Sequence, residues 1–276
     1  MRIRIRTLVI AALFAATAGG AFVYAGIYNI AATEQHTAPV YWLLDFAMRR
    51  SVKHFSREIA PPPLMDEARV QNGFRIYREK CVQCHGAPGV APDDVAYGLT
   101  PAPANLVATA REWKASEIYW VIRNGIKMSG MPGWEYRLSD AEIWDVVAFV
   151  LRLPALSPKS YAEWEAKPPP LPVELPQALT AAAGDAKAGE RALYQYLCAT
   201  CHRIPGIVGA SKHVGPPLDG MADRKYIAGV LPNTQENMIR WLRNPQRIDP
   251  LSAMPDLGVT EKDARDMAAY LSTLRH

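Results

Sequence analysis

The sequence predicts an all-α protein in which two small helical domains of one design follow an N-terminal membrane-crossing helix and an amphipathic helix. Three observations predict this organisation: the chain opens with a long uncharged apolar run, a helical apolar stripe comes next, and the remainder repeats one order of helices and loops. At 276 residues, the chain is long enough for two domains with their own cores.

The first predicted element, at 1–32, is a membrane anchor. Three arginines precede an uncharged run from Thr7 to Thr33. A helix over residues 8–30 would be about 34 Å long and would cross a hydrocarbon core of about 30 Å. The arginines should stay in the cytoplasm, so everything after the helix is exported. A cleavable signal peptide is the alternative, since 16–18 is an A-x-A site, but the apolar run continues well past it.

The segment at 33–63 predicts an amphipathic helix that ends at three consecutive prolines. Its apolar stripe consists of Tyr41, Leu44, Met48, Val52, Phe55 and Ile59. Such a helix can lie on the membrane surface, dock against a membrane-bound partner, or pack on the next domain. The first 60 residues hold seven basic and three acidic residues, which accounts for the whole net charge of +4. The basic character therefore belongs to this segment and does not support nucleic-acid binding.

All four cysteines lie in two C-x-x-C-H motifs, Cys81-Val-Gln-Cys84-His85 and Cys198-Ala-Thr-Cys201-His202. This motif is the attachment signature of c-type heme. Two thiols at this spacing reach the two vinyl groups of one porphyrin, and the adjacent imidazole falls beneath the iron. The motifs therefore predict two covalently attached c hemes, with His85 and His202 as axial ligands of the iron.

Three other uses of the cysteines compete with heme attachment. A four-thiolate zinc site needs neither histidine, and its cysteine pairs usually lie much closer in sequence. A redox dithiol would not be expected to carry histidine after the second cysteine twice. Disulfides between the motifs would require an oxidising compartment. Heme attachment is favoured because the five-residue pattern accounts for every cysteine.

The same order of parts surrounds each motif. Helices at 66–80 and 187–197 lead into the motifs, with Tyr77 and Tyr194 four residues before the first cysteine. Proline-rich turns follow at 101–106 and 214–218, then helices at 116–124 and 234–244, then a Met-Pro loop. The last helices begin at the capping signals Ser139 and Thr260.

This order resembles class I c-type cytochromes over residues 66–153 and 187–275. The resemblance implies two tandem class I cytochrome c domains, at 64–154 and 187–276, with a Pro-rich linker at 155–186. In that family the distal ligand is a methionine that commonly precedes proline, and a prolyl carbonyl orients the proximal histidine. The resemblance thus implies that Met131 and Met254 are iron ligands and that the Pro216 carbonyl orients His202. In the first copy, Pro101 and Pro103 both remain candidates for the latter role.

The first Met-Pro loop contains two methionines, and the second contains one. Met254 stands immediately before a proline, as Met131 does. The comparison therefore favours Met131 over Met128 as the ligand, and leaves Met128 to pack near the porphyrin edge.

Ligation by histidine and methionine raises the reduction potential of a heme and leaves no open position on the iron. The sequence thus predicts no catalytic residues. It predicts a carrier of single electrons from a quinol-oxidising complex or periplasmic dehydrogenase to a terminal oxidase, since 231–274 resembles cytochrome domains found in or beside heme-copper oxidases. The protein would be single-pass in the bacterial inner membrane, with its heme domains in the periplasm.

Two alternative functions remain open. One is the electron-transfer subunit of an oxidoreductase complex. The other is a diheme redox enzyme such as a peroxidase, in which one iron is open or takes a different ligand. His213 keeps the second alternative open, because it lies in a loop of the second domain where it could compete for iron.

Overall fold

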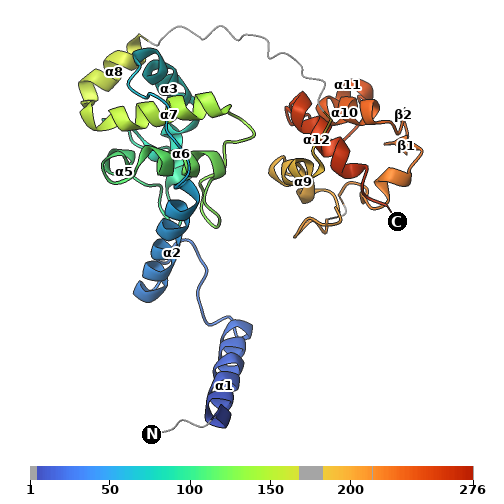
Figure 1. Cartoon of the computed structure of the whole chain (residues 1–276), viewed down its shortest axis with the longest axis horizontal. Helices are drawn as coiled ribbons and strands as arrows, with labels where there is room; N and C mark the ends of the chain where they lie inside the picture. Colours follow the sequence, from blue (N-terminus) through green and yellow to red (C-terminus); the bar gives the residue numbers. More distant parts are fainter. Residues whose placement is uncertain (1–4, 168–182, 213, 276) are drawn as a thin grey trace. The chain divides into compact units, whose positions relative to one another are not determined.

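The computed structural model of the protein describes residues 5–167, 183–212 and 214–275. These residues are mostly helical with few strands, so the all-α prediction is confirmed. The chain divides into two compact units, at 1–173 and 174–276 (Figure 1). Each C-x-x-C-H motif lies in a unit of its own.

The first helix, α1 (Ile5–Tyr24), has 20 residues, a mean hydropathy of 1.9 and no buried side chain. Within the described residues it is the one helix that is long and apolar enough to cross a membrane, although a signal sequence has the same properties. The helix begins three residues before its predicted start at Leu8 and ends six residues before its predicted end at Ile30.

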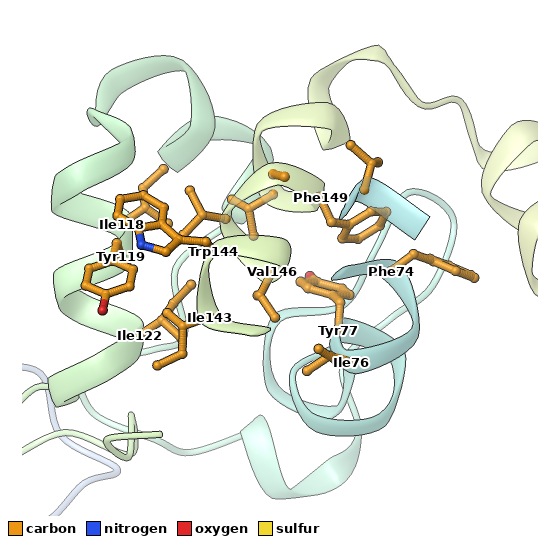
Figure 2. Packing of buried hydrophobic residues seen from close by; sticks show 14 of the residues in the cluster. Phe74, Ile76, Tyr77, Ile118, Tyr119, Ile122, Ile143, Trp144, Val146 and Phe149 are labelled. Carbon is orange, nitrogen blue, oxygen red and sulfur yellow. The ribbon is translucent and has the colours of Figure 1, made fainter. Parts of the chain in front are cut away.

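The heme-motif domain of unit 1 is a small helical bundle. Its elements are α3 (Glu67–Lys80), α4 (Val82–His85), η1 (Asp94–Ala96), α5 (Leu106–Glu112), α6 (Ala115–Asn124), α7 (Asp140–Arg152), η2 (Leu153–Ala155) and α8 (Pro158–Ala166). Helices α3 and α7 cross at Gly73, and α6 packs on another part of α7. Figure 2 shows the side chains of α6 and α3 meeting those of α7 from its two sides. Burial of this apolar surface holds the bundle together.

Helix α2 (Ala38–Ser56) packs on this bundle through its second half. Val52 and Ser56 are buried, and the Phe55 ring stacks on Trp120 of α6 with the ring centroids 5.9 Å apart. Of the three alternatives for the amphipathic helix, packing on the first domain is thus observed for this half.

The structure differs from the predicted linker over residues 155–166. Helix α8 lies there, with a capping box at Ser157 and with Tyr161 fully buried against Phe74 of α3. Trp164 packs on the same ring. The proline count of this region concealed the helix, because Pro158 occupies the first helical turn, where proline is well tolerated. Residues 168–182 of the predicted linker lie outside the described part of the chain.

Unit 2 repeats the design with changes. Its elements are α9 (Ala186–Gln195), η3 (Cys198–Thr200), η4 (Met221–Asp223), β1 (Tyr226–Ile227), β2 (Leu231–Pro232), α10 (Gln235–Arg243), α11 (Pro245–Ile248) and α12 (Glu261–Leu271). Helix α9 crosses α12 at Gly189, and α10 packs on α12. The short antiparallel hairpin β1–β2, in which Ile227 pairs with Leu231, was not anticipated from the helical patterns.

The distance from the crossing glycine to the first cysteine of the motif is one residue longer in unit 2 than in unit 1. Tyr194 is therefore not equivalent to Tyr77, contrary to what the sequence suggests. Tyr77 is fully buried, whereas Tyr194 is 57% exposed. Counted from the crossing glycines, Leu193 takes the place of Tyr77 and is 1% exposed. The extra residue is accommodated just before Cys198, where the backbone of Leu197 is left-handed with φ 61°.

Candidate heme sites

Each C-x-x-C-H motif forms a single turn at the end of its helix. In the first motif, the amide N–H groups of Cys84 and His85 both donate to the Cys81 carbonyl, at 3.1 and 3.0 Å. In the second, those of Cys201 and His202 donate to the Cys198 carbonyl, at 3.2 and 2.9 Å. One turn of backbone therefore holds two thiols and an imidazole together, as heme attachment requires.

The four thiols are free and partly buried. Burial raises the pKa of Cys81 to about 12 and that of Cys198 to about 11, so the surroundings of both sulfurs disfavour the thiolate. Zinc ligands and redox dithiols act as thiolates. Within the described residues, moreover, no three His, Cys, Asp or Glu side chains gather in a way that would hold a metal ion. Neither the burial of these thiols nor their surroundings therefore favours the zinc site or the redox dithiol.

Both histidine rings are oriented by a backbone carbonyl. The Nδ1 atom of His85 lies 2.8 Å from the Ala104 oxygen, and that of His202 lies 2.7 Å from the Pro216 oxygen. A carbonyl oxygen only accepts, so Nδ1 must carry the hydrogen in each ring. This tautomer leaves the lone pair of Nε2 available for iron. Burial also lowers the pKa of His85, which favours the neutral ring that iron needs.

The first site differs from the candidates that the sequence offered. The partner of His85 is Ala104, which follows Pro103, and neither Pro101 nor Pro103 makes this contact. The two carbonyls lie at different spacings, 19 residues after His85 and 14 residues after His202. A longer loop in the first domain brings an alanine to the position that Pro216 occupies in the second.

Gly215 lies against the face of the His202 ring. A Cβ atom at this position would be 2.4 Å from Cε1 and 2.8 Å from Nδ1 of the ring. The glycine lets the turn pass under the imidazole, so the neighbouring Pro216 carbonyl can reach Nδ1. The Gly-Pro turn was recognised in the sequence, but the contact of Gly215 with the His202 ring was not predicted.

We expect Gly215→Ala to displace the His202 ring and weaken its contact with Pro216. The low-spin spectrum of one heme should change, and its reduction potential should shift. Optical redox titration of the full chain measures both quantities. Ser211→Ala, at an exposed position in the same loop, is the matched control and should leave both unchanged. An unaltered titration in Gly215→Ala would contradict this role.

The two candidate methionine ligands have the same local structure. The amide of Met131 donates to Ser129 Oγ, and that of Met254 donates to Ser252 Oγ, each at 3.2 Å. Both methionines are partly buried, and Met131 packs against the core of unit 1. The serines were not singled out from the sequence, although both loops read Ser-x-Met-Pro and the shared pattern could have found them.

Met128 lies in a different environment from Met131. It is 95% exposed and has a left-handed backbone with φ 58°. It makes no contact with the core of unit 1, and its packing near a porphyrin edge stays a prediction. His213, the other group considered as a rival ligand, lies outside the described residues.

Comparison with known proteins assigns a family to each domain. Residues 68–150 match the family model described as cytochrome c oxidase, cbb3-type, subunit III, and residues 186–275 match the cytochrome c model. Cytochrome c-type domains imply electron transfer and the binding of heme c. The chain is a tandem of two such domains, which is consistent with a diheme class I cytochrome c.

Two curated relatives are both named cytochrome c oxidase subunit 2. The protein from Alkalihalophilus pseudofirmus is 32% identical over 91 residues, and that from Bacillus sp. (strain PS3) is 32% identical over 94 residues. Each alignment covers 33% of this chain, and the chain spans only 26% of each relative's length. No solved structure matches the chain.

Proposed function

We propose that the protein carries two c hemes and transfers single electrons in a respiratory chain. Cys81 and Cys84 would attach the first heme, and Cys198 and Cys201 the second. The iron ligands would be His85 with Met131 and His202 with Met254, and the Pro216 carbonyl would hold the His202 ring. When bound, heme iron with these ligands exchanges one electron between its ferric and ferrous states.

One observation carries this proposal: the residues proposed to bind heme make the same kinds of hydrogen bond in both units. Each histidine donates from Nδ1 to a carbonyl, and each methionine follows a serine that accepts its amide hydrogen. With both axial positions occupied, neither iron has a site for substrate. The chain is therefore proposed to be an electron carrier without catalytic residues.

The respiratory setting is supported by the kinds of protein that the domains resemble. The family model of the first domain and the two relatives are named as oxidase subunits. We propose a terminal oxidase as the acceptor, and a quinol-oxidising complex or a periplasmic dehydrogenase as the donor. Helix α1 would anchor the chain in the bacterial inner membrane, and the arginines before it would keep both heme domains in the periplasm.

The names of these oxidase subunits favour a second candidate function. The chain could be a stable electron-transfer subunit of an oxidoreductase complex rather than an exchangeable carrier. Both candidates use the same ligands and differ in how tightly the partner is held. Copurification from detergent-solubilised membranes distinguishes them, because a subunit stays with its complex.

We expect the purified full chain to contain two low-spin hemes that do not bind carbon monoxide rapidly. The reason is that a methionine occupies the sixth position of each iron. Mass spectrometry counts the attached hemes, and spectra of the reduced protein with and without carbon monoxide report the open positions. Rapid carbon monoxide binding or turnover of hydrogen peroxide would instead indicate a diheme enzyme.

A further inference from the structure

Helix α2 has two halves with different surroundings. The second half, from Arg49, is attached to unit 1: Val52 and Ser56 are buried, and Arg49 lies over the Trp113 ring, with its Cζ atom 5.6 Å from the centroid. The first half, residues 38–47, contains no buried residue and extends away from the bundle (Figure 1). The first half therefore has no partner among the described residues that would bury it.

This first half exposes a cluster of large apolar side chains. They are Tyr41 (59% exposed), Trp42 (64%), Leu43 (57%), Leu44 (49%) and Phe46 (51%). Consecutive residues of a helix point about 100° apart, so these side chains surround the helix rather than line one face. The one acidic residue among them, Asp45, forms an ion pair with Arg49 at 3.0 Å. A contiguous apolar surface of this kind marks an interaction site.

The outer surface of α2 changes along its axis. Beyond the apolar first half, Arg50 is exposed on the side opposite the buried Val52, and Lys53 is exposed on a flank of the helix. Aromatic side chains next to basic ones are typical of the boundary between lipid headgroups and acyl chains, where the rings enter the boundary and the cations meet anionic headgroups.

We propose that residues 38–47 of α2 insert into the boundary region of the membrane that α1 crosses. The inference rests on the proposed membrane location of α1. Residues 25–37 join the two helices and span at most about 45 Å when fully extended. The linker is also held to unit 1 by a hydrogen bond of 2.6 Å from Thr100 Oγ1 to the Ala32 carbonyl. The start of α2 is thus confined to the neighbourhood of the membrane surface.

A lipid environment suits this segment better than a protein groove. A groove covers one face of a docked helix and leaves the other face polar, whereas the five large apolar side chains at 41–44 and 46 surround this helix. Because the second half of α2 is packed on α6, the inserted first half would hold the first heme domain at a constant height above the membrane. Electron delivery from a membrane complex would then occur over a fixed geometry.

Photo-crosslinking in the full heme-loaded chain tests the proposal. p-Benzoylphenylalanine replaces Trp42, and the protein is irradiated in vesicles of phosphatidylethanolamine and phosphatidylglycerol and also in native membranes. We expect a phospholipid adduct, found by mass spectrometry, in both. The matched control is the same probe at Glu163 of α8, which is exposed and belongs to the end of unit 1 away from the first half of α2 (Figure 1), and it should give no lipid adduct.

Three outcomes would overturn the proposal: no lipid adduct at position 42, equal adducts at 42 and 163, or a protein adduct at 42 in native membranes. A further probe at Phe14 of α1, which is 75% exposed, reports whether α1 lies in lipid. Labelling of lipid from position 14 but not from 42 would refute the role of α2 alone. No labelling from either position would refute the membrane location as well.

Discussion

Replacing Met131 with leucine should remove the methionine-to-iron charge-transfer band of one heme, and with it about half of the band measured for the whole protein. The thioether is a soft neutral ligand that stabilises ferrous iron, so the reduction potential of that heme should also fall. Its open sixth position should bind carbon monoxide rapidly. Leucine has nearly the volume of methionine, so the loop should keep its packing on the core of unit 1.

Met128→Leu is the matched control, because it makes the same exchange three residues earlier in the same loop. Met128 does not precede a proline, as Met131 and Met254 do, so the spectrum, potential and carbon monoxide binding should stay as in the native protein. Met254→Leu should reproduce the effect of Met131→Leu on the other heme, since the two loops share the serine contact. If Met128→Leu lost the band and Met131→Leu kept it, the two assignments would be exchanged.

The cysteine motifs and the Met-Pro loops could be identified from the sequence because each demands particular residue types at a short spacing. The contact between Pro216 and His202 was implied by the resemblance to class I cytochromes, and the Pro216 carbonyl oxygen lies 2.7 Å from Nδ1 of the ring. The role of Ala104 could not be predicted, because any residue can present a carbonyl and the loop length alone decides which one reaches His85.

Helix α8 and the extra residue before Cys198 could not be predicted from the sequence for a second reason. The pattern around Tyr161 is too short and too rich in proline to indicate a helix, and its burial depends on Phe74, which is far away in sequence. The left-handed residue Leu197 carries no signature, because glycine or asparagine would be expected there. Both features depend on packing within a unit rather than on local propensity.

Gly73→Ala and Gly189→Ala should each destabilise one domain strongly. A Cβ atom at Gly73 would lie 1.9 Å from the Asp145 carbonyl oxygen, and one at Gly189 would lie 2.0 Å from that of Asp266. These obstacles are backbone atoms, so the crossing helices must move apart and lose the packing between α3 and α7 or between α9 and α12. Overpacking of this kind typically costs about 1–3 kcal/mol, which exceeds the gain in helix propensity of about 1 kcal/mol.

Chemical denaturation of the detergent-solubilised full chain, followed by heme absorbance and circular dichroism, measures the loss. Because each substitution lies in a different unit, each should lower the free energy of unfolding of its own unit and leave the other unit unchanged. Gly20→Ala provides the control: this glycine is also helical, but a Cβ atom there would meet nothing within 4 Å. If Gly73→Ala behaved as Gly20→Ala does, the crossing could not be as close as the structure has it, and the glycine before the first heme motif would have some other role.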